Sequence, residues 1–138
     1  GASIKEADRL SPAWGVNDQW EPKRSSDISE PYFYWWLKDG TVESLIYKFD
    51  KLYKVSQVQV YWLDFDQYDG NFRVPKSWKL YYKNKYEQWK EVYALNGYGT
   101  KKDCYNTLNF KPVKTTELKI STQLQHGESG GIIEWKVK

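Results

Sequence analysis

The sequence predicts an all-β protein, an antiparallel jelly-roll β-sandwich of about eight short strands. Apolar and polar residues alternate with a period of two along most of the chain, as in strands that bury one face. Turn-forming dipeptides separate the alternating runs, and no apolar stripe continues at helical spacing over three turns. Two antiparallel sheets packed face to face would bury one side of each strand.

The clearest predicted strand is 55–63, where Val58, Val60 and Trp62 share one face and mostly polar residues share the other. The same alternation predicts strands at 45–49, 78–82, 89–92, 107–110, 118–124 and 133–137. Turns are predicted at Asp39-Gly40, Asp69-Gly70, Asn96-Gly97, Gly130-Gly131 and at the prolines, including Pro112. Four tryptophans lie on apolar strand faces and are expected in the core: Trp62, Trp78, Trp89 and Trp135.

Length and composition fit one domain over 1–138 that folds without cross-links. The 138 residues include 25 aromatic residues (8 Trp, 12 Tyr and 5 Phe) and one cysteine, Cys104, which cannot form an internal disulfide. The net charge of +3 comes from scattered lysines rather than a basic stripe, which argues against nucleic acid as a partner. No segment is long and apolar enough to predict a membrane span.

The usual signatures of catalysis are missing from the sequence. It has a single histidine, no Gly-x-Ser-x-Gly elbow, no His/Cys metal cluster and no phosphate-binding glycine loop. A glycosidase needs two carboxylates facing each other across a cleft, and a small sandwich offers little enclosure. We therefore expect a domain that is not itself an enzyme.

The order of short motifs resembles the discoidin-like, or factor 5/8 type C, galactose-binding-like fold. The matching strings are Asn17-Asp18, Ser25-Ser26-Asp27, Trp35-Trp36, Tyr47-Lys48-Phe49-Asp50, Ser77-Trp78-Lys79-Leu80 and Gly131-Ile132-Ile133-Glu134-Trp135. Two strings, Arg73-Val74-Pro75-Lys76-Ser77-Trp78 and Ser129-Gly130-Gly131-Ile132-Ile133-Glu134-Trp135, resemble more narrowly the C-terminal accessory domain of bacterial β-L-arabinofuranosidase-like glycoside hydrolases. The resemblance implies a carbohydrate-binding or enzyme-supporting domain of a secreted, periplasmic or cell-surface bacterial protein. Because Gly1 stands in place of an initiating methionine, we expect a longer parent chain.

The best candidate ligand site is the long loop at 64–75. Sugar recognition needs a flat apolar face together with planar donors and acceptors for hydroxyl groups. Phe65 or Tyr68 would supply the face, and the hydrogen bonds would come from Asp64, Asp66, Asn71 and Arg73. The alternative is a solvated acidic turn in which Arg73 pairs with Asp64 across the loop neck.

Further candidate ligand residues lie in other predicted loops. His126 and Glu128 belong to the last hairpin loop, and Trp20 and Tyr98 are possible platforms. Trp20 is somewhat better explained by covering the core from the side, since tryptophan is usually largely buried.

The resemblance also implies a structural Ca²⁺ held in the early loop and closed by a glutamate of the last strand. The matching positions are Asp18, Ser25, Ser26 and Glu134, all hard oxygen donors of the kind Ca²⁺ prefers. The usual Asp-Gly-Asp run of such loops is replaced here by Asp18-Gln19-Trp20-Glu21. The alternative role for Glu134 is to accept hydrogen bonds from backbone amides of that loop.

Two functions remain open on the sequence alone. One is a carbohydrate-binding module that holds a parent glycoside hydrolase on glycans; the other is an architectural domain that buttresses or dimerises the catalytic domain. Converging polar groups beside exposed aromatic rings would favour the first, and a flat apolar patch would favour the second. A discoidin domain that binds protein or lipid would use apolar loop tips such as Phe65 and Phe72.

Overall fold

The computed structural model describes residues 2–6, 22–26, 33–35, 40–66 and 70–138. All the regular structure in these ranges is β-strand, which confirms the predicted all-β fold. None of the described residues forms a helix long and apolar enough to cross a membrane. The strands are β1 (Ala2–Glu6), β2 (Phe33–Trp35), β3 (Val42–Trp62), β4 (Ser77–Lys83), β5 (Trp89–Glu91), β6 (Tyr105–Gln123) and β7 (Gly130–Val137).

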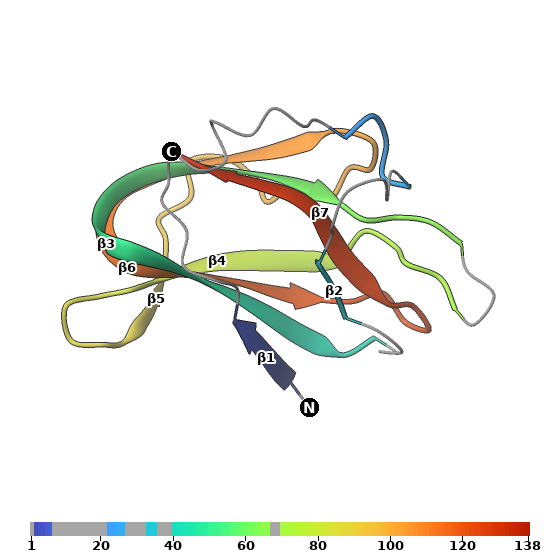
Figure 1. Ribbon diagram of the computed structural model, residues 1–138, viewed down its shortest axis with the longest axis horizontal. Helices are drawn as coiled ribbons and strands as arrows, with labels where there is room; N and C mark the ends of the chain where they lie inside the picture. The colour runs from blue at the N-terminus through green and yellow to red at the C-terminus, as the bar shows by residue number, and fades with distance from the viewer. Residues whose placement is uncertain (1, 7–21, 27–32, 36–39, 67–69) are drawn as a thin grey trace.

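The strands form one continuous sheet that folds over into two layers. Their order is β2-β7-β3-β6-β4-β5, and β1 pairs with β3 in parallel, whereas the other strand pairs are antiparallel. β3 and β6 stay paired while they bend together, so each contributes to both layers (Figure 1). One layer contains β1, β4 and β5, and the other contains β2 and β7. The sheet thereby encloses its own core as a sandwich.

Register irregularities between β3 and β6 coincide with the bend. Lys48 of β3 pairs with Glu117 of β6, and the next pair along the ladder is Tyr53 with Thr115. Four residues of β3, 49–52, therefore lie opposite a single residue of β6 and bulge out of the ladder. Extra residues on one strand bend it and increase its local twist. The bulge therefore gives a long strand the curvature that a two-layer fold needs.

The structure joins predicted strands in pairs: 45–49 continues into 55–63, and 107–110 continues into 118–124. The prediction of a turn at Pro112 was therefore wrong, because Pro112 lies inside β6. It lies beside a second irregularity, where the β3 pairing skips from Val55 to Gln57. A strand tolerates proline at a bulge, where no ladder hydrogen bond is required of it. The amides of Ser56 and Gln57 donate instead to the carbonyl of Lys138, at 2.8 and 3.0 Å.

The core lies between the layers and uses the predicted strand faces. Val58, Val60 and Trp62 are fully buried, and burial of each such side chain contributes roughly 1.5–3 kcal/mol. The indole N–H groups of Trp62 and Trp78 both donate to the carbonyl of Gly99, at 3.1 and 2.8 Å. These two bonds satisfy the polar edges of buried rings and attach the loop at Gly99 to the core.

Three of the four tryptophans predicted in the core are buried, namely Trp62, Trp78 and Trp135. The fourth prediction was wrong, because Trp89 is only half-buried. It lies on β5, a three-residue strand at the edge of the sheet. The ammonium groups of Lys83 and Lys119 lie 5.1 and 4.8 Å from the centre of its ring. An edge strand this short is covered on few sides, so an apolar residue in it need not reach the core.

Gly131 allows β2 to approach β7 closely, and we predict that Gly131→Ala destabilises the fold. A Cβ atom there would overlap the carbonyl oxygen of Phe33 and lie 2.9 Å from Leu63 Cδ2. Relieving this overlap should lower the free energy of unfolding by about 1–3 kcal/mol, measured by urea denaturation. Gly97→Ala is the matched control, since its Cβ would meet nothing within 4 Å. Equal stability of the two variants would contradict close packing of β2 on β7.

Candidate functional site

Two phenylalanines, Phe65 and Phe72, pair at the neck of the loop at 64–73. The amide of Phe65 donates to the carbonyl of Phe72 at 3.0 Å, and the reverse bond measures 2.9 Å. Their rings stack with centroids 5.0 Å apart and an interplanar angle of 28°. The loop that carries the predicted ligand residues is therefore anchored at its neck by backbone and aromatic contacts.

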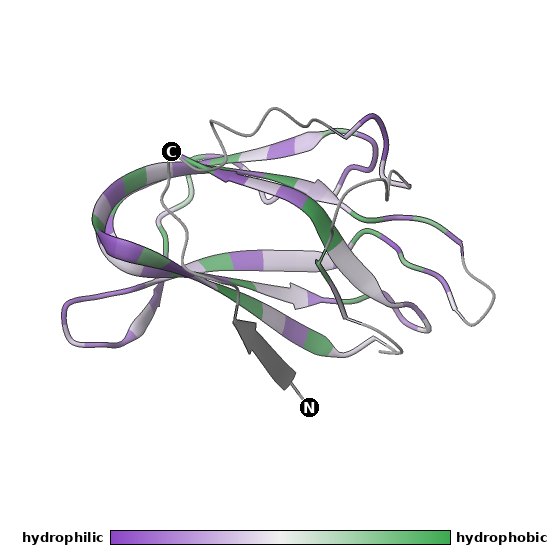
Figure 2. Ribbon diagram, viewed as in Figure 1, coloured by the Kyte–Doolittle hydropathy of each residue, from purple (hydrophilic) through white to green (hydrophobic). Residues whose placement is uncertain are grey.

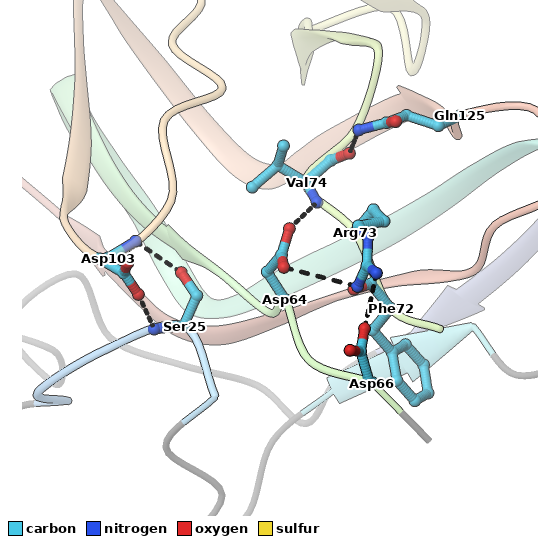
Figure 3. Close-up of polar contacts among 8 residues, drawn as sticks. All are labelled: Ser25, Asp64, Asp66, Phe72, Arg73, Val74, Asp103 and Gln125. Atoms are coloured by element: carbon cyan, nitrogen blue, oxygen red, sulfur yellow. Dashed lines mark hydrogen bonds and ion pairs between the residues drawn. The ribbon is translucent and has the colours of Figure 1, made fainter. Parts of the chain in front are cut away.

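Arg73 lies between two carboxylates at this neck (Figure 3). Its Nη2 donates to Asp66 Oδ1 at 2.6 Å, and its Nη1 lies 3.6 Å from Asp64 Oδ1. Nη1 also donates to the carbonyl oxygen of Phe72 at 2.9 Å. The side chains of Asp64, Arg73 and Asp66 are 11%, 29% and 78% exposed, respectively. These three residues, called the Arg73 group below, therefore extend from the protein interior to the solvent.

The surroundings of Arg73 are acidic. The hydrogen bond to Asp66 raises the pKa of the guanidinium, and the negative charges of Asp64, Asp66 and Glu128 raise it further, against burial, which lowers it. Three carboxylates thus surround one cation. The Asp64–Arg73 contact expected of a solvated turn is present, but Asp66 and Glu128 extend it into a larger polar group.

The last hairpin loop packs against this neck, so two predicted loops form one surface. The amide of Ser129 donates to the carbonyl of Asn71, and the amide of Arg73 donates to the carbonyl of Ser129, both at 3.0 Å. The side-chain amide of Gln125 donates to the carbonyl of Val74 at 2.8 Å. Glu128 lies in the same loop, and its Oε2 is buried without a hydrogen bond from the described residues.

The structure places the remaining predicted ligand residues differently. His126 is exposed at the tip of the last hairpin loop, next to Gly40. Tyr98 packs edge-on against Trp78, with ring centroids 4.9 Å apart. Its hydroxyl donates to Glu91 and accepts from the Leu80 amide, so its contacts are with β4 and β5.

The side chain of Tyr98 is partly withdrawn from water. Burial, opposed by the Leu80 amide and assisted by Glu91, raises the pKa of Tyr98 to about 12. Trp20 and Tyr68 lie outside the described residues.

The sequence interpretation missed Tyr34, an exposed aromatic residue beside the Arg73 group. Tyr34 is 45% exposed, and its ring meets Phe72 edge-to-face with centroids 5.9 Å apart. It lies on β2 between Phe33 and Trp35, both of which pack into the core. Period-two alternation within this aromatic run would have identified Tyr34 as the outward-facing residue.

Ser25 and Asp103 form reciprocal hydrogen bonds, and Ser25 also bonds to the backbone of Asp64. The Ser25 amide donates to Asp103 Oδ1 at 2.7 Å, and the Asp103 amide donates to Ser25 Oγ at 2.6 Å. The Ser25 carbonyl accepts from the Asp64 amide at 2.8 Å, and Asp64 Oδ2 accepts from the Val74 amide at 3.1 Å. Asp103 has a left-handed backbone, with φ of 64°, which these bonds help to maintain.

The predicted Ca²⁺ ligands are only partly described. Asp18 lies outside the described residues, and the hydroxyl of Ser26 is exposed and accepts from Arg24. Glu134 is buried, and its Oε1 accepts the Trp135 amide at 3.2 Å. Burial, with the nearby charge of Glu134, raises the pKa of Tyr47. The described residues contain no group of three acidic, histidine or cysteine side chains that would hold a metal, so Ca²⁺ binding stays a prediction.

Comparison with known proteins finds similarity in structure rather than in sequence. No protein-family model matches the chain, and no curated protein matches it. Chitosan-binding module 1 of a chitosanase/glucanase from Paenibacillus sp. IK-5 is 12% identical, with a TM-score of 0.58 over 83% of this chain and 82% of that chain. The family 32 carbohydrate-binding module of C. perfringens NanJ, solved with galactose, is 21% identical, with a TM-score of 0.59 over 82% and 81% of the two chains.

A third similar structure is CBM32-1 from a family 31 glycoside hydrolase of Clostridium perfringens. It is 20% identical, with a TM-score of 0.58 over 90% of this chain and 88% of that chain. At these identities the likeness shows the fold, which is the discoidin-like, galactose-binding-like β-sandwich expected from the sequence. One such fold hosts many functions, so the function has to be argued from the site.

We predict that Ser25→Ala destabilises the domain, because it leaves the Asp103 amide without its acceptor. The expected loss is about 1–2 kcal/mol of unfolding free energy, measured by chemical denaturation. Ser26→Ala is the control, since the Ser26 hydroxyl is exposed and should contribute less than about 0.5 kcal/mol. Equal effects of the two substitutions would contradict a supporting role for the Ser25–Asp103 pair.

The Ca²⁺ prediction has a direct thermal test. Bound Ca²⁺ should raise the midpoint of thermal unfolding with the logarithm of the free Ca²⁺ concentration, and a chelator should reverse the shift. Glu134→Gln should abolish the shift, whereas Glu87→Gln, on the exposed β4–β5 turn, should leave it unchanged. A midpoint of thermal unfolding that changes with neither Ca²⁺ nor chelator would refute the predicted site.

Proposed function

We propose that this domain is a non-catalytic carbohydrate-binding module whose glycan site is the Arg73 group. The main support for this proposal is the exposed aromatic ring of Tyr34, which packs against Phe72. Next to Phe72, the guanidinium of Arg73 lies between Asp64 and Asp66. Aromatic faces bind the apolar side of a sugar ring, and oriented charged groups bind its hydroxyls. The fold shared with carbohydrate-binding modules supports the same function.

The arrangement suits a ligand that brings its own donors and acceptors. Arg73 is oriented by two carboxylates and the Phe72 carbonyl, so it loses little conformational freedom when a hydroxyl oxygen approaches. Asp66, which is 78% exposed, is an acceptor for sugar O–H groups. Because the negative charges of Asp64, Asp66 and Glu128 all act on one cation, neutral or amino sugars fit this site better than acidic ones.

The same geometry argues against catalysis at this site. Asp64 and Asp66 both contact one guanidinium, instead of facing each other across a space that a glycosidic bond would occupy. We infer that the domain serves a parent glycoside hydrolase of a bacterium, outside the cytoplasm, and keeps that enzyme on its glycans. The parent catalytic domain and the glycan would be its partners.

The architectural function lacks a supporting surface among the described residues. Their exposed large apolar side chains are Tyr34, Val42, Leu52, Tyr86, Tyr93 and Leu95, of which only Tyr93 and Leu95 lie close together in sequence. Exposed apolar residues of this kind are normal on protein surfaces and are weak support for a buttressing face.

The proposal predicts saturable glycan binding that depends on Arg73 and Tyr34. Galactose, arabinose, N-acetyl and amino sugars, and neutral plant polysaccharides would be screened, and positive ligands titrated by calorimetry. We expect Arg73→Ala and Tyr34→Ala each to weaken binding about tenfold or more, through lost hydrogen bonds and lost stacking. Tyr86→Ala is the matched control, because Tyr86 is equally aromatic, more exposed and lies on the β4–β5 turn.

Two results would contradict the proposal. A folded domain that binds no glycan in the screen would favour the architectural function instead. Binding that survives Arg73→Ala and Tyr34→Ala but not Tyr86→Ala would place the glycan elsewhere.

A further inference from the structure

A second candidate site lies at the bend of β3 and β6. This bend is at the opposite end of the sandwich from the loop that follows β3 (Figure 1). A groove of about 400 Å³ is present there. Its walls include Lys48 and Lys51 of β3, Lys83 of β4, Trp89 of β5 and Glu117 of β6. Its volume falls within the range of small-ligand sites.

The bend collects positive charge that the sequence distributes over three distant segments. Residues 48–54, 83–91 and 111–119 carry nine lysines and four carboxylates, a formal charge of +5 in a chain whose total is +3. Figure 2 shows hydrophilic stretches along the β4–β5 turn beside this bend. The fold therefore separates a basic end from the acidic surroundings of Arg73.

Several of these lysines lie close to other lysines. Lys54 of β3 is directly opposite Lys114 of β6, a cross-strand arrangement of like charges that is unfavourable by itself. Lys119 lies beside Lys83, and burial together with that neighbouring charge lowers the pKa of the Lys119 ammonium. A bound anion would relieve the repulsion between Lys54 and Lys114, whereas the Lys83 ammonium already lies 3.0 Å from Glu117 and 3.8 Å from Glu87.

The groove also has an ordered wall. The Lys83 ammonium lies 3.0 Å from Glu117 Oε2 and 5.1 Å from the centre of the Trp89 ring. Lys119 lies 4.8 Å from the same ring and 5.1 Å from that of Tyr81. An indole beside two ammonium groups offers apolar surface next to positive charge, which matches a sugar ring that carries an acidic substituent.

We propose that this groove and the lysines around it bind an anionic polysaccharide, one bearing carboxylate or sulfate groups. The three segments supply lysines and no arginine, and each lysine ammonium is a point charge that can contact carboxylate or sulfate oxygens. Asp50 and Glu117 in the groove lining suit sugar hydroxyls but oppose the dense charge of a nucleic acid. The proposal does not depend on glycan binding at Arg73.

The test is calorimetric titration of the domain with polygalacturonate and, separately, with chondroitin sulfate. Binding should weaken steeply between about 0.05 and 0.5 M salt, as expected of screened charges. The variant Lys48→Gln/Lys51→Gln should bind about tenfold more weakly. The control Lys101→Gln/Lys102→Gln removes the same charge from two exposed residues outside the bend and should change affinity less than about twofold.

The two polysaccharides show whether carboxylate or sulfate is preferred, and binding of either supports the proposal. Failure to bind both would overturn it, as would equal losses in the two lysine variants or tighter binding of duplex DNA. Arg73→Ala and Tyr34→Ala should leave anionic binding intact. If those variants lose it, the anion binds at the loop end and the second site is refuted, whatever the outcome for neutral sugars.

Discussion

The pairing of β3 with β6 is the constraint on which the other features of this domain depend. Both strands run through both layers, so a single bent ladder sets the distance between the layers and the position of every neighbouring strand. The bulge at 49–52 and the irregularity near Pro112 allow the ladder to bend without losing its register elsewhere. One end of the sandwich is therefore a continuous bend, and the other is an open end where loops emerge (Figure 1).

The two ends of the sandwich acquire different chemistry from this arrangement. At the open end, backbone contacts bring the loop at 64–73 against the last hairpin loop, and carboxylates gather around Arg73. At the bend, strand edges and the β4–β5 turn bring lysines together around a groove. A rigid core between them lets each end act without distorting the other, which is how sandwiches commonly carry binding surfaces.

The candidate glycan site is supported by residues that do not themselves face a ligand. Ser25 and Asp103 exchange hydrogen bonds (Figure 3), and the Ser25 carbonyl accepts a hydrogen bond from the Asp64 amide. Asp64 in turn accepts a hydrogen bond from the Val74 amide, and the Val74 carbonyl accepts one from the side-chain amide of Gln125. Backbone-directed bonds of this kind fix the side chains that would meet a sugar, so less ordering is required when one binds.

The sequence by itself determined the all-β class, the buried strand faces and the grouping of polar residues at 64–73, because alternation and composition are local properties. It could not show that β3 and β6 are continuous, since a bulge depends on the partner strand rather than on neighbours in sequence. The exposure of Trp89 and Tyr34 likewise follows from where β5 and β2 lie in the sheet. Only the tertiary structure gathered the lysines at one end, because segments far apart in sequence meet there through pairing of distant strands.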